Sequence, residues 1–252
     1  PDAGLRTYEY DLAGRNSAQI DAKGQRTSFT YDTIGRVLTK TTADGKVVTF
    51  RYDETRAGYF NLGKLTTMID SSGTATTNYD FGGRAVEGTR TVDGRFFTSR
   101  SFFDSATGKL LWSQLPDGDA IGSSSAPLIY NALGQLKAVP GFANDIQYDE
   151  SGQVIRIANA NGTVTNRSFS KTRKWLNAIQ TTAASGATIQ NLAYSRDAEG
   201  KITRITSPFA HEGWDYGYDE LKRFTSASNH SSSGHNQTLA YDAFGNITYN
   251  SR

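Results

Sequence analysis

The chain has 252 residues, with 27 Lys and Arg against 25 Asp and Glu, so its net charge is +2. This near balance excludes a strongly basic surface for nucleic acid or anionic membrane as the main function. The sequence has no cysteine, which excludes disulfides and thiolate metal sites, and no apolar stretch approaches the roughly 18 residues of a membrane-spanning helix.

The predicted elements begin with a short motif that recurs along the whole chain: an aromatic residue, Asp, two variable residues, Gly, and a basic or polar residue. Nine of the thirteen tyrosines occupy its first position, and successive copies start 18 to 27 residues apart, with a mean of about 23. The eleven copies start at Tyr10, Tyr31, Tyr52, Tyr79, Phe103, Tyr130, Tyr148, Phe169, Tyr194, Tyr218 and Tyr241.

A second kind of turn falls between successive copies and consists of a polar residue followed by Gly. It ends at Gly24, Gly45, Gly73, Gly94, Gly118, Gly162, Gly186 and Gly234. The segments between the two kinds of turn hold about six residues, which is the length of a strand and too short for a helix. The sequence therefore predicts an all-β chain of repeated antiparallel hairpins.

The apolar residues of these segments indicate which side chains share a face. Before the turn they lie two apart, as at Phe29 and Tyr31, which is the spacing of a half-buried strand. After the turn they often lie three apart, as at Leu65 and Met68. Because a spacing of three moves a side chain to the other face of a regular strand, we expect a bulge or sharp twist after these turns.

Each position of the motif has a predicted mechanical role. The Asp accepts backbone N–H groups across the turn, the Gly supplies a positive φ, and the basic side chain lies over an aromatic ring of a neighbouring repeat. The residues expected to build the repeat are Tyr10, Asp11, Gly14, Arg15, Tyr31, Asp32, Gly35, Arg36, Tyr52, Asp53, Tyr79, Asp80, Gly83, Arg84, Tyr148, Asp149, Gly152, Tyr218, Asp219, Tyr241, Asp242 and Gly245.

This pattern resembles the YD repeat of the Rhs (rearrangement hotspot) family. The resemblance covers the chain from Tyr8 to Tyr249, and its fullest copy is Tyr31, Asp32, Gly35, Arg36 and Val37. It implies a fold in which sheets of hairpins spiral into a hollow shell. In bacterial polymorphic toxins and insecticidal toxin complexes, such a shell encloses a toxic C-terminal domain. Related repeats occur in wall-associated bacterial proteins and in the extracellular teneurins of animals.

Several copies depart from the family pattern. Asn131 and Ser195 stand in place of the turn Asp, and Phe103 and Phe169 in place of Tyr. Arg173 and Lys222 stand where Gly is expected, and an insertion at residues 54–64 lengthens one turn. The resemblance also implies a self-cleaving motif built on Asp-Pro, but none of the five prolines follows an Asp. The cleavage centre is therefore expected outside this segment.

Candidate catalytic and metal-ligating residues are few. His230 and His235 flank a Ser-rich loop without a second close ligand, and the acids at Asp117 and Asp119 lack the further oxygen ligands of a Ca²⁺ loop. The paired acids Asp149 and Glu150 fall in a repeat turn, where solvated turn acids are the simpler interpretation. We therefore expect no enzyme activity, no metal and no cofactor.

The favoured hypothesis is a structural shell segment of a secreted bacterial Rhs-type toxin. We expect residues 1–252 to form a single repeat array that is part of a longer protein. Its partners would be the C-terminal toxin domain and other shell segments, with no nucleic acid and no membrane span. The alternative is a carbohydrate-binding or adhesive array on the cell surface, in which Trp112 and Trp214 bind glycans.

Overall fold

The computed structural model describes residues 4–230 and 235–251, which contain strands and turns and no helix. The predicted all-β fold of antiparallel hairpins is thereby confirmed. The chain divides into two compact units, Pro1–Leu128 and Ile129–Arg252, and each is described by itself. In the described part of the chain, no helix could span a lipid bilayer. The turn expected at Gly234 lies outside the described residues.

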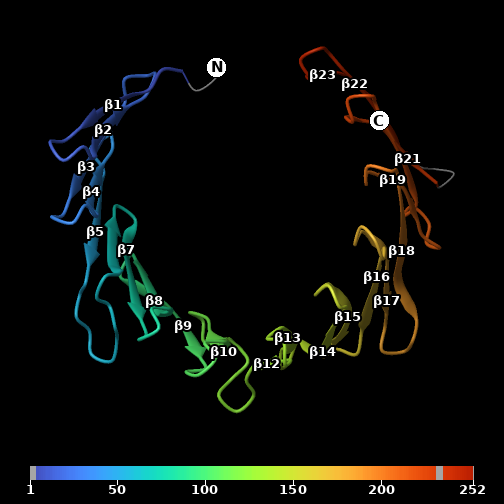
Figure 1. The fold of residues 1–252 in the computed structure, drawn as a ribbon, viewed down its shortest axis with the longest axis horizontal. Coiled ribbons are helices and arrows are strands. Elements are labelled where there is room, and N and C mark those ends of the chain that lie inside the picture. The colour runs from blue at the N-terminus through green and yellow to red at the C-terminus, as the bar shows by residue number, and fades with distance from the viewer. Residues whose placement is uncertain (1–3, 231–234, 252) are drawn as a thin grey trace. The chain divides into compact units, whose positions relative to one another are not determined.

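The first unit is one antiparallel sheet of eleven strands, which pair in chain order (Figure 1). The strands are β1 (Thr7–Tyr10), β2 (Asn16–Ile20), β3 (Arg26–Tyr31), β4 (Val37–Thr41), β5 (Val47–Tyr52), β6 (Leu65–Asp70), β7 (Gly73–Tyr79), β8 (Ala85–Val92), β9 (Arg95–Phe103), β10 (Leu110–Gln114) and β11 (Ala120–Ile121).

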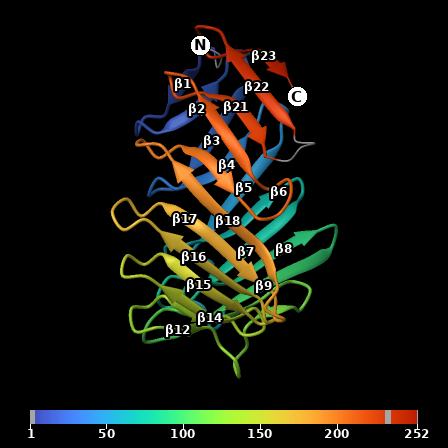
Figure 2. The ribbon, with the colours of Figure 1, turned by 90° about the vertical axis from the view of Figure 1, so that its right-hand side faces the viewer.

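The second unit contains a two-stranded sheet and a ten-stranded antiparallel sheet, again in chain order. Figure 2 looks onto the larger sheet, in which β14 to β18 lie side by side. The strands are β12 (Ile129–Tyr130), β13 (Leu136–Ala138), β14 (Ala143–Tyr148), β15 (Val154–Asn159), β16 (Val164–Phe169), β17 (Leu176–Thr182), β18 (Thr188–Arg196), β19 (Ile202–Thr206), β20 (Trp214–Tyr218), β21 (Phe224–Asn229), β22 (Asn236–Tyr241) and β23 (Ile247–Ser251).

The two kinds of turn lie at opposite edges of each sheet. Because every strand pairs with the strands before and after it in the chain, alternate hairpin turns must fall on alternate sides. The turns that follow the aromatic positions lie at one end of the strands, and this side of the sheet is here called the YD edge. The polar-Gly turns form the other side, here called the polar edge.

A β-bulge follows every turn at the YD edge, as the three-residue spacing predicted. At the hairpin of β5 and β6, Tyr52 pairs with Leu65 while Arg51 pairs with Thr67, so Thr66 is the extra residue. The bulge restores Leu65 and Met68 to one face, since Met68 pairs with Phe50. The aliphatic residues after the turn thereby oppose the aromatic residues before it.

The two faces of the first sheet differ in chemistry. One carries aromatic and aliphatic side chains such as Phe50, Tyr52 and Met68, whereas the other is rich in threonine. On the threonine face, cross-strand hydroxyls pair at 2.6 Å between Thr30 and Thr39. Few of the described residues are buried, and those that are buried are mostly small or polar. They are Ala18, Asn61, Thr66, Thr67, Asn78, Leu128, Ala138, Ala143 and Ala227.

Candidate functional site

The repeated turn is built around its aspartate. Asp32 Oδ1 accepts the backbone N–H groups of Ile34 and Arg36 at 3.1 and 2.8 Å. Asp32 Oδ2 accepts Nε of Arg36 at 2.6 Å, and the backbone closes through Gly35 N to Asp32 O at 3.1 Å. Burial raises the pKa of Asp32, but these hydrogen bonds from Arg36 outweigh it and hold the pKa below its ordinary value. The carboxylate therefore stays ionised as a fixed acceptor for the turn.

The same carboxylate contacts recur along both units. Asp11, Asp80 and Asp219 bind the side chain and the backbone N–H of the basic residue four positions later, at Arg15, Arg84 and Arg223. The glycine positions of these turns have positive φ, as expected. They are Gly14, Gly35, Gly83, Gly108, Gly134, Gly152, Gly200 and Gly245.

Six tyrosines of the motif connect their own repeat to the preceding one. The hydroxyl of Tyr52 donates to the carbonyl oxygen of Val37 at 2.9 Å, and the guanidinium of Arg36 lies 4.3 Å from the centre of the Tyr52 ring. The expected contact of a basic side chain with a neighbouring aromatic is therefore present. The same hydroxyl contact joins Tyr31 to Asn16, Tyr79 to Leu65, Tyr148 to Leu136, Tyr218 to Ile202 and Tyr241 to Phe224.

The hydroxyl bridges a gap in the hydrogen-bond ladder between repeats. β4 and β5 pair only from Thr39 and Thr49 toward the polar edge, so the strands are unpaired beside Val37 at the YD edge. The Tyr52 side chain crosses this gap, and its hydroxyl donates to a carbonyl that lies beyond the end of the pairing between β4 and β5. This role was not predicted from the sequence. The available signal was the preference for Tyr over Phe at a position where either ring could stack.

Two expected turn positions are wrong. Tyr194 does not start the turn: β18 continues to Arg196, and Asp197 N donates to Lys201 O at 3.0 Å. Arg196 thus takes the aromatic position, and Asp197 rather than Ser195 takes the Asp position. The turn forms where Gly follows Asp by three residues, at Asp197 and Gly200, and Tyr194 lies three residues before this Asp, opposite Ile205.

The turn after Phe169 is one residue longer than expected. Lys174, not Arg173, has the positive φ of 57°, and Lys174 N donates to Ser170 O at 3.1 Å. Lys222, the second residue that stands where Gly is expected, does take the glycine position, with a positive φ of 66°. Trp175 then stands in the position of the basic residue, with Arg173 4.8 Å from its ring centre. The Trp175 ring thus fills the position that the arginine side chain fills in other turns.

The insertion between β5 and β6 forms a polar cluster on the threonine face. Arg56 pairs with Glu54 at 2.7 Å and donates to Thr67 Oγ1 and Asn78 Oδ1, both at 2.8 Å. Asn61 Oδ1 accepts the backbone N–H of Tyr79 at 3.0 Å. Burial raises the pKa of Glu54, but the hydroxyls of Thr67 and Thr66 outweigh it and lower the pKa. The sequence showed the insertion but not that its polar side chains would be buried together.

Asp53 keeps its place at the longer turn. Asp53 N donates to Lys64 O at 3.1 Å, and Asp53 Oδ1 accepts Gly63 N at 2.5 Å. Arg36 reaches across from the preceding repeat to Asp53 Oδ2 at 2.6 Å. One carboxylate therefore closes a turn with ten intervening residues and also joins two repeats.

The two candidate ligand-binding tryptophans lie in different surroundings. Trp112 stacks on Phe102 with ring centres 3.7 Å apart and planes 7° apart, and it lines a groove with Tyr59, Glu87 and Arg100. Trp214 is stacked beside Tyr216 at 6.4 Å. Neither placement tests glycan binding.

The metal-ligating candidates named from the sequence have contacts of their own in the described part of the chain. His230 Nε2 lies 2.9 Å from Asp215 Oδ2, and Asp117 Oδ1 accepts the backbone N–H of Asp119 at 3.1 Å. Within residues 4–230 and 235–251, no group of three or more His, Asp or Glu side chains could hold a metal ion.

The fold and its turns define a class of protein: an all-β array of hairpins joined by aromatic and Asp side chains at one edge. The family model described as RHS Repeat matches residues 10–46 and 31–56. This match lies within the repeats on which the resemblance to the Rhs family rests, and it bears out that resemblance. No curated protein sequence matches it.

Several solved structures share the fold over almost the whole chain. The crystal structure of TcdB2-TccC3-Cdc42 matches at 20% identity with a TM-score of 0.82, covering 99% of this chain and 15% of that one. TcdB2-TccC3 without its hypervariable C-terminal region matches at 21% identity with a TM-score of 0.83, covering 98% and 15%. The Photorhabdus luminescens Tc holotoxin pore matches at 20% with a TM-score of 0.67, covering 97% and 16%. This chain thus spans about a sixth of their length, and the likeness establishes the fold.

Proposed function

We propose that this chain is a non-enzymatic wall segment of a secreted bacterial Rhs-type toxin. In this proposal the wall surrounds a C-terminal toxin domain that lies outside residues 1–252, and these residues form one continuous repeat array of about eleven hairpins. The observation that carries the proposal is the tyrosine contact between repeats, because it continues the hydrogen bonding of the sheet to the YD edge. The fold shared with the TcdB2-TccC3 structures supports it.

The physical basis of the function is containment. Proteases cut segments that can open locally, and a strand that is hydrogen-bonded on both sides opens only with its neighbours. In the first unit, every strand from β2 to β10 pairs on both sides. The tyrosine hydroxyls and stacked guanidiniums add contacts where the strand pairing stops. Such a wall would keep proteases from the cargo and the cargo from the producing cell.

Protease protection of the full-length parent protein tests the proposal. The C-terminal domain should survive digestion in the wild-type protein and become sensitive when Tyr31, Tyr52 and Tyr79 are all replaced by Ala. Tyr8→Ala, at an exposed position outside this column, is the matched control and should leave protection intact. If the C-terminal domain of the wild-type protein is digested as fast as the isolated domain, this chain does not enclose it.

The groove beside Trp112 favours carbohydrate binding as a second candidate function. Its walls are aromatic, with Tyr59 from the insertion and the Phe102–Trp112 stack, and Glu87 pairs with Arg100 at 2.8 Å within it. Aromatic faces with nearby hydrogen-bonding groups suit the apolar face and hydroxyls of a sugar ring. Glycan-array binding that is lost in Trp112→Ala and kept in Trp214→Ala would support this function. An array without any bound glycan would contradict it.

A further inference from the structure

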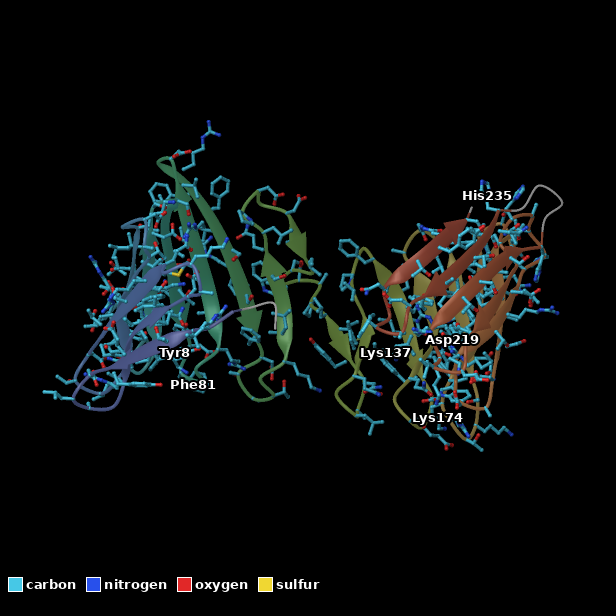
Figure 3. The ribbon with its side chains drawn as sticks, turned by 90° about the horizontal axis from the view of Figure 1, so that it is seen from above. Tyr8, Phe81, Lys137, Lys174, Asp219 and His235 are labelled. Atoms are coloured by element: carbon cyan, nitrogen blue, oxygen red, sulfur yellow. The ribbon has the colours of Figure 1, made fainter. Side chains whose placement is uncertain are left out.

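A pocket opens at the YD edge of the first unit, between the turn that joins β5 to β6 and the turn that joins β7 to β8. Its lining includes Phe60, Leu62 and Phe81, the side chain of Lys64, and the backbone at Gly82. Phe60 and Phe81 are 60 and 66% exposed, and their rings meet edge to face with centres 6.4 Å apart. Figure 3 labels Phe81. The pocket therefore combines aromatic walls with one cationic side chain.

The insertion forms one wall of this pocket and is fixed to β7. The backbone N–H of Phe60 donates to Tyr79 O at 2.8 Å, and Asn61 Oδ1 accepts the backbone N–H of Tyr79 at 3.0 Å. Asn61 is buried, with only 3% of its surface exposed. These contacts hold the Phe60 ring beside the pocket. A wall that is already in place lowers the entropic cost of binding a ligand.

Elsewhere in the chain, an arginine side chain spans the space between neighbouring YD turns. Arg36 donates to Asp53 Oδ2 on the following turn at 2.6 Å. Similar contacts are made by Arg15 and Arg223, which donate to the carbonyl oxygens of Asp32 and Asp242. Lys64 stands in the same motif position, but its ammonium lies 5.6 Å from the centre of the Tyr79 ring. In the part of the chain that the structure describes, it makes no hydrogen bond to the turn at Asp80, so the space stays open.

The Lys64 ammonium has no anionic partner. No carboxylate oxygen of the described residues lies within 4.0 Å of it. Lys201, in the same motif position of the second unit, pairs with Asp197 at 3.0 Å and with Glu199 at 2.5 Å. A Cβ atom at Gly83 would lie 2.9 Å from Lys64 Nζ, so the glycine leaves room for the ammonium beside the pocket. Its three N–H donors are thus available to a ligand.

Two ionised carboxylates limit the charge that a ligand can carry. Asp53 and Asp80 both line the pocket. The hydrogen bond from Arg36 lowers the pKa of Asp53, and Asp80 pairs with Arg84 at 2.6 Å, so both groups are ionised at neutral pH. A dianion such as phosphate would be repelled by these two charges, whereas a single carboxylate is matched by the one free cation. The apolar walls favour a ligand whose charge lies at one end.

We propose that this pocket binds a monocarboxylate with an aromatic or branched aliphatic body. The carboxylate accepts hydrogen bonds from the Lys64 ammonium, and the body packs against Phe60 and Phe81. A group of this kind occurs in free small acids and at an apolar C-terminal residue of a peptide. Neither the wall function nor glycan binding beside Trp112 requires this ligand.

An amide NMR titration of the 252-residue chain with phenylpropionate tests the proposal. The wild-type chain should bind this acid with a Kd of roughly 1 mM, and the largest shift changes should be at Phe60, Gly82 and Gly83. Phenylpropanamide, the uncharged analogue, should bind about tenfold more weakly, because it lacks the charge-assisted hydrogen bond. Tighter binding of an acetylated Gly-Gly-Phe tripeptide would identify the ligand as a peptide C-terminus, and equal or weaker binding would identify it as a free acid.

Three variants separate the pocket from a general effect of charge. Lys64→Gln should remove the preference for the acid over the amide, whereas Lys201→Gln should keep it. Lys64→Arg retains the charge but should also weaken binding about tenfold, because the longer side chain would reach the turn at Asp80 and fill the pocket.

The Lys64 side chain makes no hydrogen bond within the described fold, so its variants should give the amide spectrum of the folded wild type. Three results would each overturn the proposal. They are equal binding of acid and amide by the wild-type chain, no binding up to about 10 mM acid, and an unchanged preference for the acid in Lys64→Gln.

Discussion

Replacing Tyr52 by Phe removes a single oxygen atom, the hydroxyl that donates to Val37 O at 2.9 Å. The ring remains, so the stacking of Arg36 at 4.3 Å is kept and only the hydrogen bond between repeats is tested. A net intramolecular hydrogen bond contributes about 1 kcal/mol. Val37 is only half-buried, so the larger cost of a fully buried, unpaired acceptor does not apply. The expected loss in the free energy of unfolding is therefore about 1 kcal/mol.

The reverse substitution is available in the same sheet. Phe103 occupies the motif position without a hydroxyl, and Arg84 stacks 4.7 Å from its ring centre. The carbonyl of Ala85 stands where Val37 stands for Tyr52, directly after the basic residue of the preceding turn. Phe103→Tyr should therefore stabilise the first unit by about 1 kcal/mol, provided that the new hydroxyl reaches this carbonyl.

Denaturant unfolding measures both changes. The midpoint should fall for Tyr52→Phe and rise for Phe103→Tyr, while the dependence of the unfolding free energy on denaturant stays constant. The thermal midpoint should move by about 4 °C in each direction. If both variants unfold like the wild type, the hydroxyl adds nothing to stability, and the tyrosine column is only a packing feature.

Three further predictions concern other parts of the turns. Lys222→Gly should raise the melting temperature by roughly 2–4 °C in thermal unfolding, because a φ of 66° costs a non-glycine residue about 1 kcal/mol. Arg56→Met should lower the stability of the first unit by about 2 kcal/mol in denaturant unfolding, since Glu54 loses its ion pair. Burial raises the pKa of Asp80, but hydrogen bonds from Arg84 outweigh this effect and hold the pKa below 3.8. The stabilisation that the ionised Asp80 gives is therefore full above about pH 4, and it is lost as the pH falls through the lowered pKa. Urea midpoints between about pH 5 and 2 should fall for the wild type and less steeply for Asp80→Asn.

The sequence was sufficient for the architecture because local chemistry sets each turn. Asp and Gly three residues apart, at Asp32 and Gly35, predicted the closed turn, and the three-residue spacing of Leu65 and Met68 predicted the bulge between them. Both depend on contacts within a few residues. Turns and bulges of this kind can therefore be predicted from neighbouring residues alone.

The errors occurred where two short-range rules competed. At Tyr194 the aromatic suggested one turn and Asp197 another, and the backbone followed Asp197 because its carboxylate accepts the N–H groups of Glu199 and Lys201. After Phe169 there is neither Asp nor Gly, so nothing in the sequence set the length of the turn. The aromatic ring lies at the end of a strand but does not close the turn, and its position is the weaker guide.

The interactions between repeats were only half predictable. The stacking of Arg36 on Tyr52 followed from the reach of an arginine stem. The hydroxyl contact did not, because it depends on where strand pairing between β4 and β5 stops. The cluster around Arg56 was hidden for the same reason: an eleven-residue insertion can fold in many ways, and which strands it covers is decided by tertiary contacts.

The scarcity of buried apolar side chains explains why the turns matter so much. Among the described residues, the buried apolar residues are four alanines and Leu128, far fewer than a packed domain of this length would have. Strand pairing and half-exposed cross-strand pairs must then stabilise each sheet, and these interactions join only neighbouring repeats. A defect in one repeat should therefore weaken its two neighbours and leave distant repeats unchanged. For a wall this has a direct consequence: its weakest repeat, and not its average stability, decides where a protease enters. In the second unit the turn after Phe169 lacks both the Asp and the Gly, so the first proteolytic cut there is expected between Ser170 and Lys174.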